Sequence, residues 1–105
     1  MIAFSGCRSH EAPGERARGR VLFHEHCVLC HGENADGRGQ RREGLSGRPA
    51  DFTSAAWRSG ATADGVSRAI REGTPGTSMP AWRSLDDREV ADLTAYVLSV
   101  QKEGP

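Results

Sequence analysis

Two cysteines and a histidine stand close together in the short stretch HEHCVLCHG, which covers residues 24–32. Cys27 and Cys30 are separated by two residues, and His31 follows the second cysteine directly. Three kinds of site use a C-x-x-C-H pattern: a redox disulfide, a zinc site, or a site for covalent attachment of haem. The choice among them depends on what the rest of the chain supplies.

The first two interpretations need partners that the sequence does not provide. A thioredoxin-like C-x-x-C pair belongs to a βαβ unit, and no segment here has the alternating pattern of a strand. A structural zinc site takes four Cys or His ligands, usually as two separated pairs. This chain has one cysteine pair with His24, His26 and His31 beside it, and no second cluster. The pattern therefore favours haem attachment.

In the haem interpretation, the thiols of Cys27 and Cys30 become thioethers to the two vinyl groups. The step from one cysteine to the other is close to one helical turn, so both sulfur atoms point to the same side. His31 then binds the iron from the proximal face, and the sixth ligand must come from elsewhere in the chain.

Met79 is the candidate for that sixth position, and Met1 is the only other methionine. Most methionines pack in cores, but Met79 lies in the turn-rich segment GTSMPAW rather than on an apolar helix face. Pro80 follows it, lacks a backbone donor and stiffens the segment. A thioether paired with His31 raises the reduction potential of haem iron.

A single small domain must position these residues. The chain has 105 residues, of which 13 are glycine and 6% are aromatic, so its side chains supply a thin core. A flat apolar macrocycle would complete that core. The formal net charge is zero, which gives no indication of nucleic-acid binding. No run approaches the ~18 apolar residues of a membrane-spanning helix.

Apolar periodicity predicts helices and no strands. The first helix covers residues 15–32, and the second extends from its cap at Thr62 to Gly73. The last helix begins where Ser84 and Asp87 form a pattern that resembles a capping box. The sequence therefore predicts a helical domain.

The remaining segments carry little apolar period. Residues 33–61 predict a long loop, which is unusual in a small domain unless it is functional or wraps something. Residues 1–13 are expected to be a flexible tail or tether ahead of a domain at 14–105.

Cys7 ends the sequence Phe-Ser-Gly-Cys, which resembles the end of a bacterial lipoprotein signal, where the cysteine carries the lipid. The residues before it are too few for the ~7–15-residue apolar region of a signal peptide. A lipid anchor at Cys7 therefore requires a start codon upstream of Met1. The alternative is an ordinary free thiol on a tail.

Through these residues, the sequence resembles a class I cytochrome c over about residues 14–102. RPADFT, AIREGTPGTSMPAW and LDDREVADLTAYVLSV look like the single-haem bacterial cytochromes that serve oxidases and dehydrogenases. The resemblance implies an all-α cytochrome c fold, with three to five helices and long loops around one covalent haem c. It also implies that the terminal helices cross where Gly19 and Phe23 meet Leu93 and Tyr96.

The resemblance extends to residues around the haem. In the family, a proline carbonyl usually accepts the N–H of the proximal histidine, and Pro49 is the candidate here. Trp57 is the candidate for an aromatic near a haem propionate, with packing at the core edge as the alternative. His24 and His26 are expected to face solvent. Four arginines are candidates for one side of a docking surface, or for a solvated loop: Arg38, Arg41, Arg42 and Arg48.

The implied function is one-electron transfer, with iron cycling between Fe(III) and Fe(II) while His31 and Met79 stay bound. We therefore expect an electron carrier rather than an enzyme, free or as a subunit of an oxidoreductase complex. It would be a monomer in the bacterial periplasm, exchanging electrons with redox proteins of a respiratory or dehydrogenase chain.

Two alternatives remain open. One is a gas sensor or peroxidase-like protein in which a labile Met79 leaves the iron, and carbon monoxide binding to the ferrous protein tests it. The other is a zinc-binding interaction module, which would be colourless and contain zinc without iron.

Overall fold

The structure is a computed structural model, and the residues that it describes are 14–100. The expected tail at 1–13, with Cys7, lies outside the described residues. Between residues 14 and 100 the chain forms α-helices and one 3-10 turn, with no strand, in agreement with the predicted all-α class. The elements are α1 (Glu15–His26), α2 (Val28–His31), η2 (Arg42–Gly44), α3 (Ala55–Gly60), α4 (Ala63–Glu72) and α5 (Asp87–Ser99).

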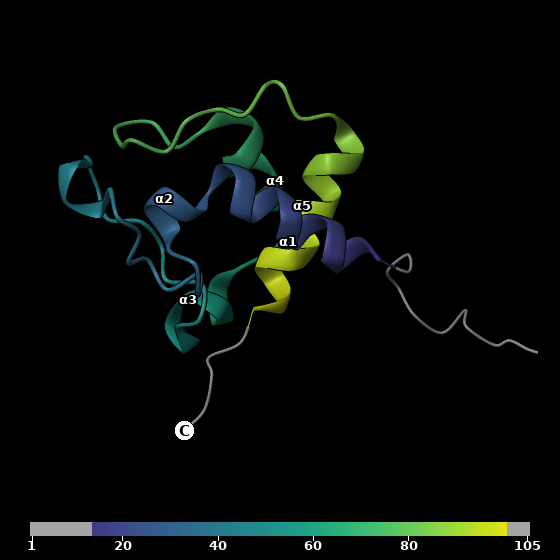
Figure 1. The fold of residues 1–105 in the computed structure, drawn as a ribbon, viewed down its shortest axis with the longest axis horizontal. Coiled ribbons are helices and arrows are strands. Elements are labelled where there is room, and N and C mark those ends of the chain that lie inside the picture. The colour runs from purple at the N-terminus through teal and green to yellow at the C-terminus, as the bar shows by residue number, and fades with distance from the viewer. Residues whose placement is uncertain (1–13, 101–105) are drawn as a thin grey trace, which may run out of the picture.

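The main packing contact is the crossing of α1 and α5 (Figure 1). A Cβ atom placed on Gly19 would lie 2.0 Å from the backbone oxygen of Asp92, so only glycine allows this approach. Phe23 and Leu93 are buried beside the crossing, and the ring centroids of Phe23 and Tyr96 are 5.3 Å apart. The residues expected at the crossing of the terminal helices therefore meet there.

The first helix is interrupted at Cys27. A continuous helix was expected over 15–32, but α1 ends at His26 and α2 follows after a single turn residue. The Cys27 carbonyl accepts two backbone N–H groups, from Cys30 at 3.2 Å and from His31 at 2.9 Å, which tightens the chain there. Gly32 ends α2, as predicted, at φ +86°.

Helix α5 begins with a capping box, but the prediction placed it on the wrong residues. Asp86 is the N-cap and accepts from the Glu89 N–H at 2.8 Å, while the Glu89 carboxylate accepts from the Asp86 N–H at 2.9 Å. Ser84 lies in the preceding turn. Asp87 is paired with Arg71 at 2.8 Å instead. The longer glutamate side chain reaches back to the cap, which favours this register.

Helix α4 has the expected boundaries, because the Thr62 hydroxyl accepts from the Gly65 N–H at 3.0 Å and Gly73 ends the helix at φ +74°. The predicted loop at 33–61 instead contains η2 and the short helix α3, which Ser54 caps. Among the helices of residues 14–100, none is long and apolar enough to span a membrane.

The apolar core is small and opens onto a cavity. Its buried side chains form one cluster: Phe23, Ala35, Phe52, Ile70, Val90, Leu93 and Val97. All of these except Ala35 and Val90 also line the cavity described below. The core therefore forms one wall of this cavity.

Candidate functional site

A cavity of about 780 Å³ lies between α1, α2, the segment at 45–50, α3, α4 and the segment at 74–82. This volume falls in the range of ~300–1,000 Å³ that is usual for small-molecule and cofactor sites. The residues predicted for the site all line it: Cys27, Cys30, His31, Pro49, Trp57 and Met79. The fold thus brings these six residues together from four separate segments: 27–31, 45–50, α3 and 74–82.

The two cysteines lie on the wall formed by α1 and α2, and both are free thiols. Burial, reinforced by the neighbouring Cys30, raises the pKa of the Cys27 thiol to about 12. The sulfur of Cys27 is therefore uncharged at neutral pH. A thioether carries no charge, so this environment suits covalent attachment through sulfur.

The imidazole of His31 is held by a hydrogen bond and by an aromatic ring. Its Nδ1 lies 3.2 Å from the carbonyl oxygen of Ala50, and because a carbonyl can only accept, Nδ1 carries the proton. The ring stacks on Phe52, with centroids 4.6 Å apart and planes inclined by 24°. Burial lowers the pKa of His31, partly offset by the hydrogen bond to Ala50. The neutral ring therefore keeps the Nε2 lone pair available for a metal.

The acceptor for His31 is Ala50, so the role predicted for Pro49 was wrong by one residue. The Pro49 carbonyl oxygen lies against another segment, where a Cβ atom on Gly37 would come within 2.9 Å of it. The next carbonyl, that of Ala50, is the one that faces the imidazole. Pro49 still lines the cavity, and its ring restricts the backbone that leads to Ala50.

Phe52 is a site residue that the sequence analysis missed. It is buried and contacts His31, Phe23 and Trp57. The sequence feature that could have indicated it is its aromatic side chain in RPADFT, three positions after Pro49. The rest of that segment has little apolar period.

Met79 lies on a different wall of the cavity, in the segment that follows α4, and is half-buried. Its backbone N–H donates to the Thr77 hydroxyl at 3.2 Å, and its carbonyl accepts from the Thr74 N–H at 3.2 Å. A Cβ atom on Gly73 would lie 2.7 Å from the Met79 carbonyl oxygen, so glycine is needed where this segment leaves α4. His31 and Met79 therefore enter one cavity from separate elements.

Two further aromatic residues, Trp57 and Trp82, line the cavity. Trp57 of α3 packs on Phe52 with ring centroids 4.7 Å apart. Trp82 lies 4.9 Å from the ring of His26. His24 is exposed, as expected, whereas His26 is half-buried and lines the cavity, so the expectation of a solvent-facing His26 was wrong. The contact with Trp82 covers that imidazole.

An arginine-rich loop lies beside the cysteines. We call Arg38, Arg41, Arg42 and Arg48 the basic loop, and all are exposed. The loop is fastened to α2, because the Gly39 N–H donates to the Cys30 carbonyl at 3.0 Å and the Arg41 N–H to the Leu29 carbonyl at 2.8 Å. Leu29 itself is 52% exposed. The basic loop therefore places positive charge beside Leu29, an exposed apolar residue within the attachment motif.

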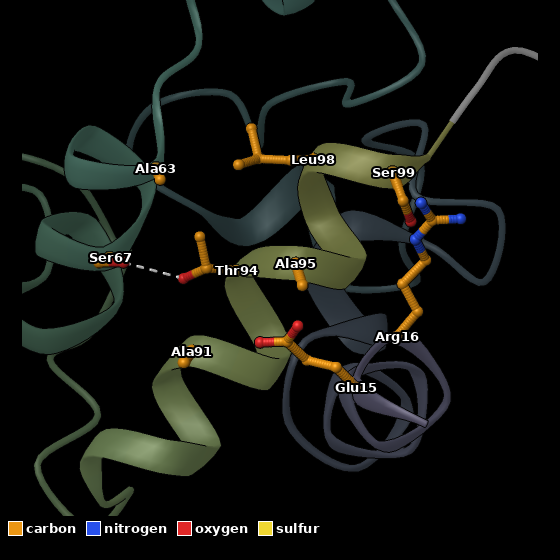
Figure 2. A pocket seen from close by; sticks show the side chains of 9 residues that line it. All are labelled: Glu15, Arg16, Ala63, Ser67, Ala91, Thr94, Ala95, Leu98 and Ser99. Carbon is orange, nitrogen blue, oxygen red and sulfur yellow. Dashed lines mark hydrogen bonds between the residues drawn. The ribbon is translucent and has the colours of Figure 1, made fainter. Parts of the chain in front are cut away.

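A second hollow of about 420 Å³ lies on another face of α5, near the starts of α1 and α4 (Figure 2). The hydroxyls of Ser67 and Thr94 bond to each other there, 3.0 Å apart. None of the residues predicted for the site lies in it. Within residues 14–100, no three His, Cys, Asp or Glu side chains group closely enough to hold a metal ion.

Comparisons with known proteins place this geometry in context. The family described as Cytochrome c matches residues 16–101. Cytochrome c55X of Paracoccus denitrificans is 38% identical over 88 residues, covering 80% of this chain and 73% of that protein. The Cbb3-type cytochrome c oxidase subunit FixPc of Rhizobium leguminosarum bv. viciae is 33% identical over 89 residues, covering 84% of this chain. This chain spans only 29% of that relative's length.

A solved structure has the same arrangement of helices. The KustC0563 c-type cytochrome superposes with a TM-score of 0.67 at 31% sequence identity. The match covers 80% of this chain and 98% of the other.

Proposed function

Because this chain belongs to the cytochrome c family and carries one covalently attached haem c, we propose that it transfers single electrons through an iron held by His31 and Met79. The predicted all-α cytochrome c fold is confirmed by the solved relative. Family membership also decides among the three interpretations of the C-x-x-C-H pattern, in favour of haem attachment.

One observation carries the proposed ligation: His31 and Met79 line the same apolar cavity from separate elements, beside both cysteines. When bound, haem supplies the Fe(III)/Fe(II) couple. Cys27 and Cys30 anchor the group in the proposal, and His31 offers Nε2 while Nδ1 donates to Ala50. The buried apolar wall excludes water, and a thioether ligand together with this burial favours a raised potential. With both axial positions filled, we infer a carrier rather than an enzyme.

The proposed partners are donor and acceptor redox proteins of a bacterial respiratory or dehydrogenase chain. The Rhizobium relative is named as a subunit of a cytochrome c oxidase, which supports a respiratory partner. We further propose a monomeric carrier domain in the periplasm, with Cys7 as a candidate lipid tether. The proposal covers both a carrier that works alone and a carrier domain within a larger subunit.

The test is an optical spectrum of the purified protein and of Met79→Ala. The wild type should show sharp c-type bands when reduced and the weak long-wavelength methionine–iron band when oxidised. Met79→Ala should keep its haem, lose that band and bind carbon monoxide. Its potential should fall by on the order of 0.1 V, within the ~0.8 V range that axial ligands cover.

Val21→Ala is the matched control, since Val21 is 58% exposed on α1 and should leave the spectrum unchanged. A potential that is the same in Met79→Ala as in the wild type would overturn the ligand assignment. Ready carbon monoxide binding by the wild type at neutral pH would instead favour the gas-sensing or peroxidase-like alternative.

A further inference from the structure

Two hydrogen bonds join the Met79 segment to the segment ahead of Pro49. The Ser78 N–H donates to the Ser46 carbonyl at 3.0 Å, and the Ser46 N–H donates to the Ser78 hydroxyl oxygen at 2.9 Å. Both serines line the cavity and are exposed. We call this pair, with its two hydrogen bonds, the serine latch.

The latch is extended by backbone packing next to it. Gly47 has φ +80°, and a Cβ atom there would lie 3.0 Å from the Thr77 side chain. The two segments therefore also touch where Gly47 meets the Thr77 side chain, next to the latch.

The other hydrogen bonds of residues 74–79 that the structure describes stay within that segment. The Thr77 N–H and hydroxyl donate to the Thr74 carbonyl, and the Met79 N–H and carbonyl bond to Thr77 and Thr74. Beyond the segment, the Trp82 N–H donates to the Ile70 carbonyl of α4 at 2.8 Å. In the described part of the chain, the hydrogen bonds that join the middle of the segment to another element are therefore the two with Ser46.

We propose that Ser78 is a positioning residue, which through the serine latch holds Met79 on the iron and keeps the sixth coordination position closed to external ligands. This inference rests on the proposed function, because it requires Met79 to be the axial ligand. In this proposal, release of Met79 from the iron moves the segment at 74–79 away from Ser46 and breaks both latch hydrogen bonds. The contacts of His31 with Ala50 and Phe52 lie on other segments and would stay intact.

The size of the effect follows from the strength of one exposed hydrogen bond. Loss of such a bond changes an opening equilibrium by about 2- to 10-fold. Ser78→Ala removes the acceptor for the Ser46 N–H and leaves the backbone hydrogen bond from Ser78 possible. The same factor should therefore appear in the affinity of an external ligand that competes with Met79.

The experiment is an optical titration of the ferric, haem-loaded protein with imidazole at neutral pH. Ser78→Ala should bind imidazole about 2- to 10-fold more tightly than the wild type. Ser78→Thr keeps the hydroxyl and should return the affinity toward the wild-type value. Ser59→Ala is the control, because the Ser59 hydroxyl donates to Ala56 within α3, away from the latch. Equal imidazole affinity in wild type and Ser78→Ala would overturn the proposal.

A second measurement uses the wild type alone, in case Ser78→Ala does not fold. The amides of Ser46 and Ser78 should be protected from hydrogen exchange and should lose that protection when imidazole binds. Rapid exchange of both amides without imidazole would also overturn the latch. A wild type that lacks the methionine–iron band contradicts the proposed ligation itself, whereas a wild type with that band and an unaffected Ser78→Ala contradicts only the latch.

Discussion

The His31 imidazole is constrained in direction by one neighbour and in plane by another. The Ala50 carbonyl accepts from Nδ1 at 3.2 Å, which fixes where that edge of the ring points. The face of Phe52, 4.6 Å away and inclined by 24°, limits rotation of the ring about its own axis. Together the two contacts define the orientation in which Nε2 is presented.

Replacement of Phe52 by leucine should therefore alter the haem electronically while leaving it attached. The negative face of the phenyl ring favours the more positive imidazole of the ferric state, so Phe52→Leu should raise the reduction potential. The expected rise is ~20–60 mV, the one-electron equivalent of the ~0.5–1.5 kcal/mol of an aromatic contact. Potentiometric titration measures it, together with electron paramagnetic resonance of the oxidised protein, which reports ligand orientation. Phe52→Tyr retains the ring and should behave as the wild type, and an unshifted Phe52→Leu would contradict the stacking role.

At this scale, residue types and spacing predicted six side chains that line one cavity, but not all the residues that orient them. Cys27, Cys30 and His31 are adjacent in sequence, so their grouping needs no long-range information. The acceptor for His31 depends on which carbonyl of the 49–50 segment faces the ring, and that is a matter of backbone direction. The predicted acceptor, Pro49, therefore lies one residue before the actual one, Ala50. Phe52 was not predicted because it meets His31 only in the folded chain.

At the scale of elements, the close approach of α1 and α5 depends on Gly19. A methyl group there would lie 2.0 Å from a backbone oxygen of α5, so one helix must move. Gly19→Ala should lower the free energy of unfolding by about 1–3 kcal/mol, the usual cost of overpacking. Denaturant unfolding of the haem-loaded protein measures this.

Gly60→Ala is the matched control, because a Cβ atom at Gly60 of α3 meets nothing within 4 Å. It should be neutral or slightly stabilising, as alanine favours helix over glycine. Similar stability of Gly19→Ala and Gly60→Ala would show that the helices do not cross as tightly as described.

Helix ends with strong local signals were predictable, whereas elements held by distant contacts were not. Thr62 and Gly73 bound α4 through their own hydroxyl and backbone conformation, which sequence encodes directly. The turn η2 is different, since it follows the Gly39 segment that packs on α2. Helix α3 is too short for a detectable period, and the box at Asp86 required a choice between two overlapping patterns.

Viewed as a whole, the molecule has no formal net charge, and its basic loop lies apart from the acidic residues at the start of α5. The basic loop lies beside α2, at one end of the view in Figure 1, and α5 begins toward the other end. That beginning carries Asp86, Asp87 and Glu89. An electron that passes near Leu29 and the cysteines would therefore cross a positive surface.

Small redox reagents of opposite charge test this separation. Electron exchange with hexacyanoferrate, an anion, should slow several-fold as ionic strength rises above ~0.1 M, where the Debye length is ~10 Å. Exchange with a cationic cobalt phenanthroline complex should accelerate instead. Stopped-flow absorbance measures both rates.

The variant for this experiment reverses charge within the basic loop, and its control does so elsewhere. Arg41→Glu with Arg42→Glu should weaken or invert both salt dependences without changing the spectrum. Arg88→Glu, an exposed change on α5, should leave them nearly as in the wild type. Salt dependences that are flat in the wild type would argue against a positive surface at the attachment motif.

The cavity of about 780 Å³ also has a consequence for the life of the polypeptide in the cell. Five of the seven side chains in the buried apolar cluster face that cavity, so a newly made chain has little to hold it together until haem is attached. We therefore expect such a chain to be open to proteolysis and the haem-loaded protein to resist it. Cellular proteases would then degrade chains that have not received haem. The abundance of this protein would therefore depend on the supply of haem.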